Sequence, residues 1–105
     1  MSNILTSNVL NARIVSVTFD PAGCAVNTTN EQTVTVSGVK VGDLVFVNKP
    51  SSTTGVGVVG ARVSEADTVA INFGNFTAAT VNPASEAYVL LIVRPDGSAG
   101  TDANM

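Results

Sequence analysis

The sequence predicts an all-β fold, a small β-sandwich or jelly-roll-like barrel of short antiparallel strands. Hydrophobic and polar residues alternate with period two along most of the chain, as they do in strands that bury one face. Valine, threonine, isoleucine and phenylalanine fill these runs, while glycine, proline, asparagine, aspartate and serine separate them. The spacing of the runs is typical of sandwiches and barrels, and no convincing amphipathic helix is found.

The length of 105 residues corresponds to one domain. We expect a single β domain over residues 12–95, an N-terminal arm over residues 1–11 and a flexible C-terminal tail over residues 96–105. The first residues could also form a short strand or a helical turn. The tail is expected to be flexible because it follows Pro95 and lies at a chain end.

The first predicted strand covers residues 13–19 and ends at the following DPAG sequence. Proline fixes φ and glycine opens the positive-φ region, so this sequence interrupts the pairing. A second strand is predicted over residues 32–37, with valines on one face and threonines on the other. Gly38 and Gly42 are expected to bracket a short turn segment.

Residues 55–63 predict a strand weakened by glycine, a residue that marks a bulge or a close approach by another backbone. The next strand, residues 68–73, is expected to turn Val69, Ile71 and Phe73 inward. Ala70 and Asn72 are expected to point outward. The SEAD sequence between these strands predicts a tight turn, whose serine and aspartate are placed to bond nearby backbone amides.

Two predicted strands, residues 43–49 and 87–94, carry apolar side chains on both faces. A two-layer sandwich buries one face of each sheet, so these strands need a cover on the second face. A loop or the N-terminal segment could supply it, or another subunit could, since each apolar side chain contributes about 1.5–3 kcal/mol when buried. The two faces are interchangeable by sequence alone. We predict a subunit interface formed by one face of each strand, namely Val45, Val47, Val89, Leu91 and Val93.

The composition argues against catalysis. The chain has no histidine, which removes the commonest general base, the usual nucleophilic triads and most zinc sites. Cys24 is the only cysteine, so it cannot form an intrachain disulfide and is expected to be a small packed or loop residue. Acidic residues fall mostly at strand ends and turns, where a bound calcium ion is a minor alternative to solvated carboxylates. We predict no enzyme and no catalytic, cofactor-binding or metal-binding residues.

Other recognition classes find little support. The net charge is −3 and the five basic residues are scattered, so we expect no nucleic-acid partner. The longest apolar run, residues 87–93, is too short to span a membrane as a helix. The GVGVVG sequence lacks the lysine and the helix of a phosphate loop. The glycosylation sequons at Asn27 and Asn75 are expected to be chance matches in a chain rich in asparagine and threonine.

Several distinctive fragments follow one another between residues 16 and 95. They are FDP at 19–21, QTVTV at 32–36, VGDLVFVNKP at 41–50, ARVSEADTVAINFGNFT at 61–77 and the closing VLLIVRP. In this order and spacing they resemble small structural proteins of tailed bacteriophages, specifically the head decoration, or capsid cement, family.

The resemblance implies a virion protein on the outer capsid surface, which stabilises the shell by bridging capsid subunits. Its implied partners are the major capsid protein and copies of itself, with a homotrimer favoured by binding at local threefold positions. Residues 2–11 would then dock on a neighbouring subunit. The alternatives are a phage fibre or tail component acting as a host-glycan-binding module and, with less support, a hydrolase whose catalytic groups are carboxylates.

Overall fold

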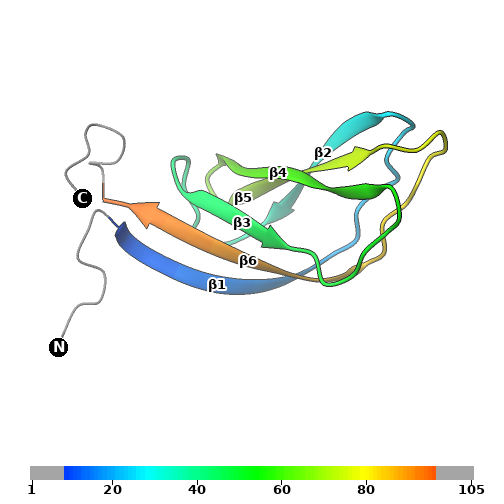
Figure 1. Ribbon diagram of the computed structural model, residues 1–105. Helices are drawn as coiled ribbons and strands as arrows, with labels where there is room; N and C mark the ends of the chain where they lie inside the picture. The colour runs from blue at the N-terminus through cyan, green and yellow to red at the C-terminus, as the bar shows by residue number, and fades with distance from the viewer. Residues whose placement is uncertain (1–8, 97–105) are drawn as a thin grey trace.

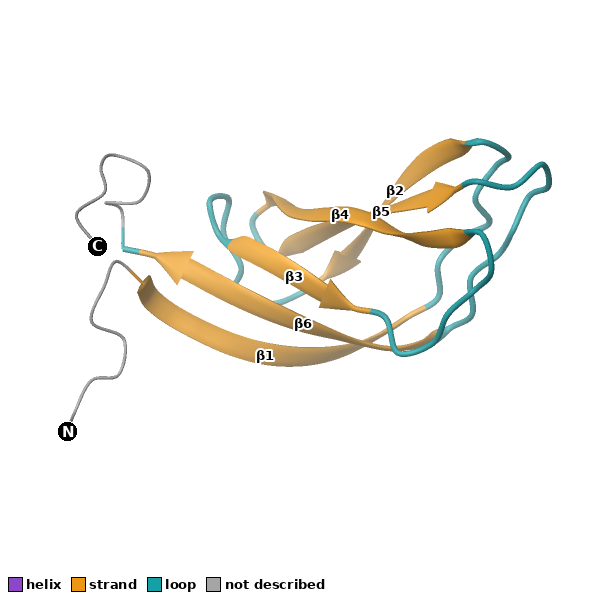
Figure 2. Ribbon diagram, viewed as in Figure 1, coloured by secondary structure: helices purple, strands orange, loops and turns teal. Residues whose placement is uncertain are grey.

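The computed structural model describes residues 9–96. This part of the chain contains six strands and no helix, which confirms the predicted all-β fold (Figure 2). The strands form two three-stranded sheets in a small sandwich. The strands are β1 (Val9–Phe19), β2 (Thr28–Thr35), β3 (Leu44–Asn48), β4 (Val56–Glu65), β5 (Thr68–Asn75) and β6 (Glu86–Pro95).

One sheet has the order β1-β6-β3 and the other the order β2-β5-β4 (Figure 1). All pairings within them are antiparallel. The last described strand, β6, therefore lies in the middle of the first sheet, between two strands that come much earlier. Only β4 and β5 are both neighbours in sequence and paired in a sheet.

Two strands begin several residues earlier than the sequence pattern predicts. β1 begins at Val9, inside the range assigned to the N-terminal arm, because its first residues pair with the end of β6. β2 begins at Thr28, because Thr28 to Asn30 pair with the end of β5, and it ends before Val36. The rest of the predicted arm, residues 1–8, and all of the tail except Asp96 lie outside the described residues.

The core lies between the two sheets, where alternate side chains of the central strands meet. An aromatic cluster fills one part of it: the rings of Phe19, Phe73 and Tyr88 lie with centroids 5.6–6.3 Å apart. Tyr88 meets the other two rings edge-on or nearly so, a favourable arrangement for aromatic quadrupoles. The buried residues of this core are Val36, Val39, Val63, Val69, Ile71, Phe73, Tyr88, Leu90 and Ile92.

Ala70 points away from the core, as the alternation predicts, because it lies opposite Thr33 and Arg62. It is nevertheless buried, with 0% exposure. It lies on the central strand of its sheet, and a methyl group is too short to rise above the longer side chains on either side. The alternation therefore predicts the face on which Ala70 lies but not whether it reaches solvent.

The turn between β4 and β5 is shorter than the predicted SEAD turn. β4 continues to Glu65, and Asp67 adopts a positive φ of 62°. The Asp67 carboxylate does not bond a local amide: it accepts a hydrogen bond from the backbone N–H of Gly38 at 2.7 Å. The predicted turn segment from Gly38 to Gly42 is confirmed, since both glycines have positive φ.

A buried asparagine joins the loops at the opposite end of the sandwich. Asn75 is 1% exposed, and its amide N–H₂ donates to the carbonyl oxygens of Cys24 and Ala79. Its side-chain oxygen accepts from both the backbone N–H and the hydroxyl of Thr77. One side chain thus satisfies groups from two loops, and every hydrogen-bonding atom of its amide is used.

We predict that Asn75→Ala lowers the free energy of unfolding by about 3 kcal/mol, because it removes the four hydrogen bonds that this buried side chain makes to two loops. Urea denaturation followed by circular dichroism measures the change. Asn48→Ala, at an exposed site on β3, is the matched control and should change stability little. An equal loss in both variants would contradict the role given to Asn75.

Tyr88 provides a second test of the core. Its side chain is fully buried and its hydroxyl has no hydrogen-bond partner among the described residues. Burial raises the pKa of Tyr88 to about 12, with a smaller contribution from the negative charge of Glu86. Because the folded pKa exceeds the unfolded value, the stability linked to this group is complete below about pH 10 and is lost as pH rises towards 12.

We therefore expect Tyr88→Phe to leave stability at pH 7 unchanged or raised by up to about 1 kcal/mol, since it removes an unpaired buried hydroxyl. Above pH 10 the advantage of the variant over the wild type should grow. Unfolding curves at pH 7 and at pH 11 measure both effects. A variant that is less stable than the wild type at both pH values would show that the hydroxyl has a partner.

Candidate subunit interface

The outer face of the β1-β6-β3 sheet carries a continuous apolar surface. Ile14 of β1, Leu91 of β6 and Phe46 of β3 lie opposite one another in the register and form one row across all three strands. Val93 lies in the adjacent row, between Ala12 and Leu44. We call the set Ile14, Leu44, Phe46, Val89, Leu91 and Val93 the outer apolar face.

Four of these side chains are exposed, and Val89 and Val93 are half-buried. Ile14 is 73% exposed, Phe46 56%, Leu44 51% and Leu91 38%. Large exposed side chains of this kind are common singly, but a contiguous group on one sheet face usually marks an interaction surface. The sequence suggested two possible covers for this face, namely a loop or the N-terminal segment of the same chain, or another subunit. No described loop covers it.

The structure divides the predicted interface residues between the two faces of the sheet. Val89, Leu91 and Val93 point outward, as one face of β6. Val45 and Val47 point inward, because they pair with Ile92 and Leu90 of β6 and pack against the core.

The members of β3 on the outer face are therefore Leu44 and Phe46, which the predicted set leaves out. The sequence could not assign the sides, since both faces of β3 and β6 are apolar.

Charged residues are excluded from the outer face over the described strands. The charges of β1 and β6 fall at inward-facing positions: Arg13 pairs with Ile92, and Glu86 pairs with Phe19. Arg94 also belongs to the inward-facing set, two residues beyond Ile92. This distribution inverts the usual arrangement, in which a sheet turns its charges towards water.

Each charge at the two ends of β6 is paired. Glu86 forms an ion pair with Lys49, with Nζ and Oε2 2.8 Å apart, and accepts a hydrogen bond from the hydroxyl of Ser51 at 2.6 Å. The hydrogen bond from Lys49 is the main cause that lowers the pKa of Glu86, followed by that from Ser51. The inward position of this charge is therefore compensated locally.

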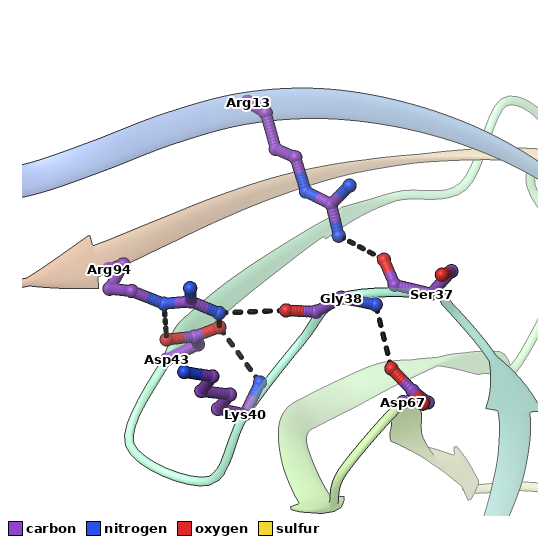
Figure 3. A network of polar contacts seen from close by, with 7 residues as sticks. All are labelled: Arg13, Ser37, Gly38, Lys40, Asp43, Asp67 and Arg94. Atoms are coloured by element: carbon purple, nitrogen blue, oxygen red, sulfur yellow. Dashed lines mark hydrogen bonds and ion pairs between the residues drawn. The ribbon is translucent and has the colours of Figure 1, made fainter.

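At the other end of β6, Arg94 holds Asp43 in a two-pronged ion pair (Figure 3). The guanidinium Nε and Nη2 lie 2.8 and 2.7 Å from the carboxylate oxygens, and Nη2 also donates to the carbonyl oxygen of Gly38. The Asp43 side chain is 3% exposed and also accepts from the backbone N–H of Lys40. The hydrogen bonds from Arg94, and secondarily that from Lys40, lower the pKa of Asp43.

This network fixes the loop between β2 and β3. Arg13 of β1 donates to the carbonyl oxygen of Ser37, and Asp67 accepts from Gly38 in the same loop (Figure 3). Contacts from three elements thus set the position at which β3 starts. They fix the register that places Phe46 beside Leu91 on the outer face.

The outer face of the β2-β5-β4 sheet has a different character. It carries threonines of β2 and an exposed two-pronged ion pair between Arg62 and Glu31, with Nη2 and Oε1 2.8 Å apart. The hydrogen bond from Arg62 lowers the pKa of Glu31. Polar groups suited to water thus cover much of this face, although Val59 and Phe76 are exposed near its end. The outer face of the β2-β5-β4 sheet is therefore more polar than that of the β1-β6-β3 sheet.

The other candidate positions have structural roles or stay open. Cys24 is fully buried and pairs through its backbone with Val81, as expected for a packed residue. The Asn75 sequon is inaccessible in the folded chain because its amide is buried and bonded.

Within residues 9–96 no three side chains of the metal-ligating types gather closely enough to hold an ion. The same residues contain no helix long and apolar enough to cross a membrane.

Comparison with protein-family models, curated proteins and solved structures found no match. Any functional conclusion therefore depends on the surface of this chain and on the resemblance of its sequence fragments.

We predict that Arg94→Met destabilises the protein at pH 7 more than Arg62→Met does. Both changes remove a two-pronged ion pair, but only the first leaves a buried carboxylate without its partner. Urea midpoints at pH 7 measure the difference. Equal midpoints for the two variants would show that burial of Asp43 does not matter.

The same variant has a defined pH dependence. Because the folded pKa of Asp43 is lowered, its contribution to stability is complete above about pH 4 and is lost as pH falls below that value. The stability gap between the wild type and Arg94→Met should therefore shrink as the pH is lowered towards 2. A gap that widens in acid would contradict the direction of the pKa shift.

Proposed function

We propose that this chain is a structural virion protein that decorates the outer surface of a phage capsid and stabilises it by bridging capsid subunits. The observation that carries the proposal is the outer apolar face: a sheet face without charged side chains, left uncovered by the described part of the chain. A monomer in water gains nothing from such a face, whereas an assembled protein buries it. The fragments that resemble head decoration proteins supply the setting.

The proposed mechanism requires no chemistry. Packaged DNA presses on the shell from within, and a rigid β-domain attached across neighbouring capsid subunits adds contacts that must break before they separate. Many identical sites on a shell make a modest affinity at each site sufficient. In this proposal the chain acts as a homo-oligomer, with a trimer favoured at local threefold positions, and has no enzymatic activity.

The sandwich suits a load-bearing role. Its two ends are closed by buried polar networks, one centred on Asp43 and Arg94 and the other on Asn75. Such networks tie loops to strands, so a pull on one sheet is shared by both. These features support the proposal and are also compatible with a tail or fibre component.

The proposal is tested with capsids from the virion that carries the protein, stripped of it and incubated with the purified chain. We expect co-sedimentation with the capsids, ordered density on their outer surface in cryo-electron micrographs, and a higher temperature of DNA release. An unrelated β-sandwich of similar size and charge is the control. Density on the tail or fibres instead, or glycan binding by the isolated chain, would overturn the proposal.

A further inference from the structure

We infer that the outer apolar face is the surface through which copies of this chain pack against one another. This deepens the proposed function, on which it rests for its setting, by naming the occupant of the face: a second copy, rather than the capsid protein. The residues concerned are Ile14, Leu44, Phe46, Val89, Leu91 and Val93.

Charge favours a second copy. In a symmetric interface, residues near the axis meet their own counterparts, so a charge there would face a like charge. The outer apolar face has no charged side chain within the described strands, although the whole chain carries a net charge of −3. An interface between two different proteins usually gains specificity from complementary charges, and this face carries no charged side chain. It is complementary to itself.

The shape of the face favours the same occupant. Leu91 lies on the central strand, with Ile14 on one side and Phe46 on the other. Two such rows can interdigitate as the inner faces of a sandwich do, at a sheet separation of about 10 Å. In the next row towards the start of β6, the polar side chains Ser16 and Asn48 lie on either side of Val89, so the face becomes more polar at this end.

Size sets the expected strength. At a strand spacing of about 4.8 Å and a rise of about 3.3 Å per residue, the five rows shared by three strands cover roughly 240 Å² in projection. The continuing β1-β6 pair adds roughly 160 Å². The total lies below the roughly 800 Å² that each partner contributes to a standard interface. We therefore expect self-association with a dissociation constant in the micromolar range, made effective by the high local concentration on a shell.

Sedimentation equilibrium of the full chain tests the inference. The wild type should form a dimer, because two sheet faces packed on each other close a pair, and Leu91→Glu should weaken this association at least about 30-fold. Thr33→Glu, at an exposed position on β2 in the other sheet, is the matched control and should associate like the wild type. A monomeric wild type at about 100 µM, far above the expected micromolar constant, would overturn the inference. So would an assembly unaffected by Leu91→Glu.

A second variant keeps the test decisive if Leu91→Glu fails to fold. Leu91→Cys places a thiol at the centre of the face, and the native Cys24 does not compete because it is fully buried. Mild oxidation should yield disulfide-linked pairs of the folded variant, while Thr33→Cys should yield few. Equal yields from the two variants would overturn the inference.

The two proposals fail separately. If the wild type is monomeric but still loads onto capsids, and Leu91→Glu abolishes the loading, the face binds the capsid protein and only the self-association inference is wrong. If the chain associates through Leu91 but never attaches to capsids, the inference holds and the proposed function is wrong.

Discussion

The structure depends on β6, because both faces of this central strand are apolar and only one of them packs in the core. Its inward side chains Tyr88, Leu90 and Ile92 belong to the core that holds the sheets together. Its outward side chains are apolar as well, so the strand has no face suited to water. A central strand covered on both sides is ordinary in a three-layer protein, but the described part of this chain supplies only two layers. Whatever provides the third layer has to come from elsewhere.

The position of the charges follows from the same constraint. Charged side chains on β6 occur only at its ends, where Glu86 and Arg94 turn inward and find partners in Lys49 and Asp43. A charge turned inward without a partner would be costly, so the loops that bring Lys49 and Asp43 into place are part of what keeps the other face neutral. The absence of charge from the outer face of the sheet therefore depends on the position of these loops.

The sequence predicted much of the architecture and less of the candidate interface. The sequence located all six described strands: alternation indicates β1, β2 and β5, apolar runs between turn residues indicate β3 and β6, and a run interrupted by glycine indicates β4. It did not predict that the outward-pointing Ala70 is buried, or that Asp67 bonds Gly38, which lies far away in sequence. It also could not tell which side of β3 faces the core, since Leu44, Val45, Phe46 and Val47 are all apolar. That choice is made by packing between sheets, which no local pattern records.

The central place of β6 has a further consequence for how the chain acquires its fold. During synthesis β1 and β3 leave the ribosome long before the strand that joins them, so their sheet cannot close until the last segment has been made. The β4-β5 hairpin, by contrast, pairs neighbours in sequence and can form early. High sequence separation slows folding. A nascent chain that ends before residue 86 would expose unpaired apolar edges and be a natural client for chaperones.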